Sequence, residues 1–147
     1  MILHVGDSHI ASDSLTGPLR RLFQTRFGDG GRGYAQPGRP GRYFRQFDMS
    51  YSMSRGWTVH QGQRSSATGR FGLSGVRLDA DGSDVELTRA SCKRCDIGSL
   101  FDSFTVFYLR QPTGGSFELS VDGQPALVVH TASSPGSSDL GVVRHHL

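Results

Sequence analysis

Several residue types are scarce or missing in the sequence. Two kinds of segment are also missing, a long apolar stretch and a basic N-terminal segment with a cleavage site. The 147 residues include no asparagine, one lysine, one tryptophan and two cysteines. No stretch reaches the roughly 18 apolar residues that a membrane-spanning helix needs. Met1 leads straight into an apolar run, without the basic segment and cleavage site of a secretory signal. The sequence therefore predicts neither a membrane span nor a signal peptide in this chain.

The two cysteines, Cys92 and Cys95, form a single C-x-x-C pair. A zinc site of this type needs a second pair, and a redox pair is expected at the start of a helix that follows a strand. Here the pair lies among β-like segments. It is interpreted as an ordinary loop or strand pair, and a local disulfide and a metal or catalytic role stay open as alternatives.

Acidic residues are scarce in the first half of the chain. Residues 1–70 contain ten arginines and four aspartates, whereas residues 71–147 contain six basic and nine acidic residues, so the net charge of +3 hides a basic first half. Such charge, with aromatic residues between the arginines, suits nucleic acid or an anionic polymer. No nucleic-acid motif accompanies it, and a solvated loop is the simpler interpretation. The arginines concerned are Arg32, Arg39, Arg42, Arg45 and Arg55.

The first fifty residues predict a strand, a turn and a helix. Ile2–Val5 is a short apolar run that ends at Gly6, as in a buried parallel strand. Thr16 is the expected N-cap of the helix, Pro18 fits its first turn and Gly28 ends it. Together these elements form the first half of a βαβ unit, an α/β N-terminal piece. The apolar face of the helix consists of Leu15, Leu19, Leu22, Phe23 and Phe27.

From residue 28 to residue 56 the periodicity fails, and the sequence predicts a loop that is too long for an idle connection. From Trp57 onward it predicts seven short strands, in 57–60, 70–80, 84–90, 103–110, 116–123, 126–131 and 140–147. Both faces of 103–110 are expected to be largely buried, whereas 116–123 leaves one face in water. This pattern indicates an antiparallel sandwich or jelly roll.

Two domains are expected from this change of character. Residues 1–56 form the α/β piece with its Gly/Arg-rich loop, and residues 57–147 form the all-β sandwich. The chain stops within a predicted strand, whereas complete domains usually finish in frayed, surface-like residues. The sandwich is therefore expected to be incomplete at its C-terminus.

Asp7, Ser8 and His9 follow the first predicted strand immediately. A serine at a strand-to-helix turn is exposed, and the N–H groups of the helix point at the charge that develops on an attacked carbonyl oxygen. Ser8 is therefore a candidate nucleophile. The alternative from spacing alone is that Asp7 and Ser8 only cap the helix.

Residues 4–33, HVGDSHIASDSLTGPLRRLFQTRFGDGGRG, resemble the first conserved block of the SGNH (GDSL-type) hydrolases. They are most similar to the branch with a histidine after Gly-Asp-Ser, typified by bacterial peptidoglycan O-acetylesterases. The resemblance is specific over residues 2–41. It is weaker over 57–147, where that family has an inserted β-sandwich like a carbohydrate-binding module. The matching residues are Gly6, Asp7, Ser8, His9, Asp13, Thr16, Leu19, Arg20, Gly28, Asp29, Gly30 and Gly31.

The resemblance implies hydrolysis of an ester, most specifically the removal of acetyl groups from a bacterial glycan such as peptidoglycan, in the periplasm or outside the cell. It implies no cofactor and no metal. Ser8 would be the nucleophile and its N–H an oxyanion donor, while Asp7 would brace the turn. His9 is not expected to be the base, because the side chains of neighbouring residues usually point apart.

Other parts of that family's catalytic machinery have no counterpart in the sequence. Its further oxyanion donors are a glycine and an asparagine from later blocks, and its base is the histidine of a late D-x-x-H. This chain has no asparagine, and none of its six histidines has an aspartate three positions earlier. Because triad members act as a unit, the chain is expected to be a fragment that does not turn over esters by itself.

A second class of function stays open, a non-catalytic glycan-binding module built by residues 57–147. Trp57 and Tyr108 would stack on sugars, and the Arg-rich loop would contact anions. Trp57 can equally be a core aromatic residue. Neither alternative predicts a nucleic-acid partner.

Overall fold

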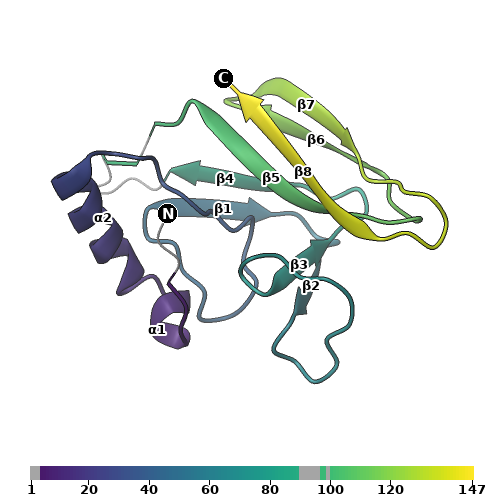
Figure 1. The fold of residues 1–147 in the computed structure, drawn as a ribbon, viewed down its shortest axis with the longest axis horizontal. Helices are drawn as coiled ribbons and strands as arrows, with labels where there is room; N and C mark the ends of the chain where they lie inside the picture. The colour runs from purple at the N-terminus through teal and green to yellow at the C-terminus, as the bar shows by residue number, and fades with distance from the viewer. Residues whose placement is uncertain (1–3, 90–96, 99) are drawn as a thin grey trace. The chain divides into compact units, whose positions relative to one another are not determined.

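The computed structural model describes residues 4–89, 97, 98 and 100–147, and within them the fold is mostly antiparallel β-sheet with two helices (Figure 1). The chain divides into two compact units, Met1–Phe101 and Asp102–Leu147. The domain boundary that the sequence predicts lies between residues 56 and 57. It rests on a resemblance and not on compactness, and it stays a prediction. The predicted pair Cys92 and Cys95 lies outside the described residues.

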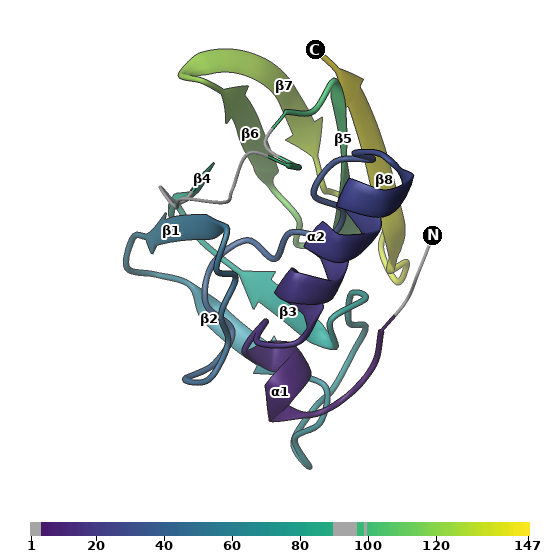
Figure 2. The same cartoon turned by 90° about the vertical axis from the view of Figure 1, so that its left-hand side faces the viewer.

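The first unit combines two helices with two pairs of strands. Helices α1 (Ser8–Ala11) and α2 (Thr16–Phe27) are joined by a short turn (Figure 2). A long irregular segment then leads to β1 (Met49–Met53), β2 (Thr58–Gln61), β3 (Val76–Asp79) and β4 (Val85–Arg89). Strands β1 and β4 pair antiparallel, and so do β2 and β3, so the second pair is nested in sequence within the first.

Helix α2 forms where the sequence predicts it, but it begins differently. Its N-cap is Leu15, without a side-chain cap, so the prediction of Thr16 as N-cap is wrong. The Thr16 hydroxyl donates instead to Asp13 Oδ1 at 2.6 Å, because Asp13 brings its carboxylate to the start of the helix. Asp13 itself has a left-handed backbone, with φ of 57°. At the other end Gly28, with φ of 102°, closes the helix as predicted.

The predicted apolar face of α2 is largely exposed. Leu22, Phe23 and Phe27 all present large apolar surfaces to solvent. The rings of Phe23 and Phe27 stack on each other with centroids 6.1 Å apart, as side chains one turn apart can. The periodicity therefore predicts the helix correctly. It does not show that the apolar face is buried.

The strand predicted over residues 2–5 is not confirmed. His4 and Val5 belong to no strand and are exposed, and Met1–Leu3 lie outside the described residues. What the structure shows of the region around Ser8 is a short helix preceded by irregular backbone.

Strand β1 lies inside the stretch predicted to be a loop, so that prediction is wrong for residues 49–53. The alternation in Met-Ser-Tyr-Ser-Met places Met49, Tyr51 and Met53 on a half-buried face and the serines on an exposed one. Ser50 lies directly opposite Thr88 of β4, and their hydroxyl oxygens are 2.6 Å apart. The period of two was present in the sequence, but the Gly/Arg-rich surroundings masked it.

The second unit is entirely β-structure. It contains β5 (Ser103–Arg110), β6 (Ser116–Val121), β7 (Gln124–His130) and β8 (Asp139–His146). Strand β5 pairs antiparallel with β8, and β6 with β7. Asp122 and Gly123, with φ of 50° and 77°, form the two-residue turn of the β6–β7 hairpin, as Asp-Gly favours. Every strand predicted from Trp57 onward thus has its counterpart in the described chain.

The interior of the second unit is built by one face of each strand pair. The Tyr108 ring of β5 meets the edge of Phe117 of β6 at 5.6 Å, and Phe117 lies opposite Val129, which is 6% exposed. The prediction that both faces of β5 are buried is wrong, because Phe107, on the other face, is 50% exposed. The Tyr108 face packs against β6 within this unit.

Gly141 of β8 lies directly opposite Tyr108, and a Cβ atom at this position would overlap the Tyr108 ring. We expect Gly141→Ala to lower the free energy of unfolding by about 1–3 kcal/mol, because the ring is fixed against Phe117 and cannot retreat freely. Chemical denaturation measures the change. Gly115→Ala, where a Cβ meets nothing within 4 Å, is the matched control. Equal losses in the two variants would contradict this account of the core.

Candidate functional site

Ser8 is the first residue of α1, and Asp7 is its N-cap. The Asp7 carboxylate accepts a hydrogen bond from the His9 N–H at 3.1 Å, and His9 Nδ1 lies 3.2 Å from the same oxygen. The backbone hydrogen bond from His9, followed by the bond from its ring, lowers the pKa of Asp7. Asp7 therefore stays ionised and holds the turn on which Ser8 is presented.

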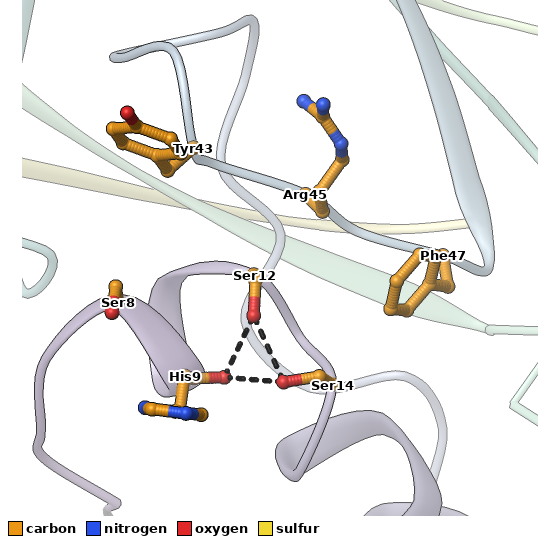
Figure 3. A pocket seen from close by; sticks show the side chains of 7 residues that line it. All are labelled: Ser8, His9, Ser12, Ser14, Tyr43, Arg45 and Phe47. Carbon is orange, nitrogen blue, oxygen red and sulfur yellow. Dashed lines mark hydrogen bonds between the residues drawn. The ribbon is translucent and has the colours of Figure 1, made fainter.

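His9 is paired with Asp7 and not with Ser8. Both side chains of the Asp7–His9 pair are largely exposed. The His9 ring points away from the segment that carries Tyr43 and Arg45 (Figure 3). Ser8 is exposed, and its hydroxyl takes no part in the hydrogen bonds that join the neighbouring serines (Figure 3). Among the residues that the structure describes, no side chain is hydrogen-bonded to the Ser8 hydroxyl, so none is placed to take its proton.

Ser8 lies on the wall of a pocket of about 390 Å³. One side of the pocket comes from α1 and the turn after it, and the other from the irregular segment that precedes β1 (Figure 3). The pocket thus combines hydroxyl groups, two aromatic rings and a guanidinium. The residues that line it are Ser8, His9, Ser12, Ser14, Tyr43, Arg45 and Phe47.

The hydroxyl groups at the base of the pocket form a small network around one carbonyl. The oxygens of Ser12 and Ser14 both donate to the His9 carbonyl, at 3.1 and 3.2 Å, and lie 2.9 Å from each other. These bonds fix the turn between α1 and α2. They also leave Ser8 as the pocket serine whose hydroxyl is not committed to this network.

Two backbone contacts bring the far wall of the pocket to α1. The Arg45 N–H donates to the Ala11 carbonyl at 2.8 Å, and the Phe47 N–H donates to Asp13 Oδ2 at 3.2 Å. Both contacts join residues more than thirty positions apart. The pocket therefore depends on hydrogen bonds from the main chain of the Arg-rich segment to α1 and to the turn that follows it.

A cluster of partly buried charges fixes this segment against α2. Asp48, just before β1, accepts from Arg20 at 2.8 Å and from Arg32 at 3.0 Å. Arg20 also lies 3.6 Å from Asp13, whose side chain is 7% exposed. Burial is the largest influence on Arg32 and lowers its pKa, while the nearby Asp48 carboxylate opposes that effect. Two cations and two anions thus neutralise one another in the interior of the first unit.

A pair of buried glutamines closes the same segment into a loop. The side-chain oxygen of Gln46 accepts from the Gln36 N–H at 3.2 Å, and its amide donates back to the Gln36 carbonyl at 3.0 Å. Tyr34 and Ser74 both donate to the side-chain oxygen of Gln36. Desolvation of Tyr34 raises the pKa of its phenol. The stretch predicted as an irregular loop is irregular, but polar contacts give it a defined path.

The residues predicted to stack on sugars have structural contacts. Trp57 is half-buried, and its indole N–H donates to the Asp84 carbonyl at 2.9 Å. The Tyr108 ring packs between Phe117 and Gly141 inside the second unit.

The sequence predicts a site at Asp7, Ser8 and His9 but does not identify the far wall of the pocket. Arg45 stands out in the sequence only as part of a basic stretch with aromatic residues between its arginines. The length of that stretch is the signal that points to the far wall, since a loop of this size is usually functional.

Within the described residues, no group of three His, Cys, Asp or Glu side chains gathers as metal ligands do. Neither described helix is long and apolar enough to cross a membrane. Comparison of the chain with family models, with curated proteins and with solved structures found no match.

Asp48 is predicted to be essential for the path of the segment before β1. Asp48→Asn removes the charge that neutralises Arg20 and Arg32, and we expect a loss of about 3 kcal/mol in the free energy of unfolding, since both cations stay largely buried. Chemical denaturation measures this loss. Asp81→Asn, at an exposed position, is the control and is expected to change stability by less than about 0.5 kcal/mol. A loss at Asp48 no larger than the control's would contradict the role of the cluster.

The Asp7 cap is predicted to be sensitive to acid. Because the pKa of Asp7 is lowered in the folded chain, its contribution to α1 is present above the ordinary aspartate pKa near 4 and is lost as the pH falls through the lower, folded value. Carboxyl NMR titration should give a midpoint for Asp7 below 4. His9→Ala should raise that midpoint only in part, because the larger effect comes from the backbone N–H, which the variant keeps. A complete return to 4 would show that the ring dominates instead.

Proposed function

We propose that the chain carries the nucleophile-bearing part of an SGNH-type serine ester hydrolase. The enzyme would remove acyl groups, acetyl groups above all, from a bacterial cell-wall glycan in the periplasm or outside the cell. One observation supports this proposal most directly: Ser8, the serine of the Gly-Asp-Ser-His motif, lies on the wall of a pocket with its hydroxyl outside the local network. A serine that only capped a helix would use its oxygen to accept a backbone N–H.

The local geometry gives the motif residues separate roles in this proposal. Asp7 accepts the His9 N–H and so supports the turn, while Ser8 faces the pocket. In the proposed reaction the Ser8 oxygen bonds to the acyl carbon, the ester C–O bond breaks, and the sugar hydroxyl leaves with the proton. In this proposal residues 1–56 belong to the α/β catalytic domain and residues 57–147 to its inserted β-sandwich.

The described pocket contains the group that would attack an ester, but not the groups needed for repeated hydrolysis. The nucleophile and a binding wall are present, whereas the imidazole of the adjacent His9 points away from the opposite wall and is held by Asp7. Without a base, Ser8 attacks slowly, and water is not activated to release the acyl group afterwards. The chain by itself should therefore accept an acyl group from a reactive ester and keep it.

This expectation is tested with p-nitrophenyl acetate in excess. Mass spectrometry of the digested chain should find the acetyl group on Ser8 in preference to Ser12 and Ser14, and no steady release of p-nitrophenol should follow. Ser8→Ala should abolish the labelled peptide. Ser66→Ala, an exposed serine outside the pocket, should leave labelling at Ser8 unchanged.

Two outcomes would count against different parts of the proposal. Acetylation of Ser8 no faster than that of other exposed serines would remove the assignment of Ser8 as the nucleophile. Steady hydrolysis that disappears in Ser8→Ala would keep the nucleophile but overturn the expectation that the chain cannot complete the cycle.

A further inference from the structure

Three arginines lie close together on the segment that forms one wall of the Ser8 pocket, and one of them, Arg45, lines the pocket itself. The Arg39 guanidinium donates to the Arg42 carbonyl at 2.6 Å, and the Arg45 guanidinium donates to the same oxygen at 3.3 Å. The Arg42 guanidinium lies 5.8 Å from the centre of the ring of Tyr43, a pocket residue. Arg39, Arg42 and Arg45 therefore form one cationic group, here called the arginine rim.

The arginine rim has no compensating negative charge in the described part of the chain. Three other arginines of the first unit do have carboxylate partners: Arg20 and Arg32 are paired with Asp48, and Arg77 with Asp79. The guanidinium groups of Arg39 and Arg45 donate only to backbone carbonyls, the Arg42 guanidinium lies over the Tyr43 ring, and all three residues are exposed. Like charges held together repel one another, so an anion that binds among them relieves that repulsion.

The segment that carries the rim is held in place at several points. The Arg45 N–H is bonded to the Ala11 carbonyl, and the Phe44 N–H to the Gly41 carbonyl. The Gln61 amide of β2 donates to the Pro40 carbonyl at 2.5 Å. A ligand therefore meets cations on an ordered main chain, which reduces the entropy lost on binding.

We propose that the arginine rim recognises the carboxylates of an acidic polysaccharide, and that it places an ester of that polysaccharide at Ser8. The choice of ligand rests on the proposed function of Ser8 and on the chemistry next to the rim. The pocket offers serine hydroxyls and one aromatic face to a sugar, and guanidinium groups bind carboxylates with two parallel hydrogen bonds. The rim shares Arg45 with the pocket, so one polymer can reach both.

The test measures equilibrium binding of the full chain to two forms of one polymer, polygalacturonate and its fully methyl-esterified form. The wild-type chain should bind the carboxylated form at least about tenfold more tightly than the neutral form, and added salt should weaken only the first. The triple variant Arg39→Gln/Arg42→Gln/Arg45→Gln should bind polygalacturonate about tenfold more weakly. The charge-matched control, Arg26→Gln/Arg55→Gln/Arg70→Gln, replaces exposed arginines outside the rim and should keep most of the affinity.

Three results would overturn the inference. They are equal binding of the charged and neutral polymers, an equal loss of affinity in the two triple variants, or tighter binding of a single-stranded oligonucleotide than of polygalacturonate. The comparison of the two polymers uses only the unaltered chain, so it decides the question even where a variant unfolds. Binding requires no reaction at Ser8. Failure of Ser8 to accept an acyl group, together with selective binding at the rim, would therefore reject the proposed hydrolase and retain the anion site.

Discussion

The neutralisation of four charges, those of the buried Asp13 and of the partly buried Arg20, Arg32 and Asp48, is the constraint on which the first unit depends. Asp48 accepts from Arg20 of α2 and from Arg32 of the following segment, while Asp13 lies beside Arg20. Removing such charges from water is unfavourable unless each finds a partner, so the chain must bring together the turn before α2, the helix itself and the start of β1. Once Asp13 is held there, its second oxygen accepts the Phe47 N–H, and the wall of the pocket follows. The position of Ser8 relative to Tyr43 and Arg45 is thus a consequence of charge pairing and not of apolar burial.

The sequence was a good guide wherever local pattern decides the structure. The helical spacing of Leu19, Leu22 and Phe23 located α2, and alternation with Asp-Gly punctuation located the strands of the second unit and the turn of the β6–β7 hairpin. It failed where distant residues decide. Nothing local in Asp48 reveals that it will meet Arg20 and Arg32, so the defined path of the segment could not be anticipated. Strand β1 is a different case, because its period of two is present in residues 49–53 but lies in Gly/Arg-rich surroundings. The sequence therefore predicted one half of the candidate site, the motif around Ser8. The other half, the wall formed by Tyr43, Arg45 and Phe47, depends on contacts between residues more than thirty positions apart.

The two walls of the pocket have different chemical characters. The wall at α1 carries the hydroxyl groups of Ser8, Ser12 and Ser14. The opposite wall carries one guanidinium, that of Arg45, and two aromatic rings, and Arg45 has no acidic partner among the described residues. A reaction at Ser8 requires a proton acceptor for its hydroxyl. Recognition of a ligand at the opposite wall requires only that the main chain of that segment keep its contacts with Ala11 and Asp13. Recognition can therefore persist in a chain that lacks the means to complete catalysis.

The second unit begins and ends at one place. Ser103 of β5 lies opposite His146 of β8, and the Leu147 N–H donates to the Asp102 carbonyl at 2.8 Å. Because the residues before β5 and after β8 are hydrogen-bonded to each other, they lie no further apart than adjacent strands normally do. The pairing of β5 with β8 thus continues one residue beyond each strand, so the two outermost positions of this unit hold each other in place.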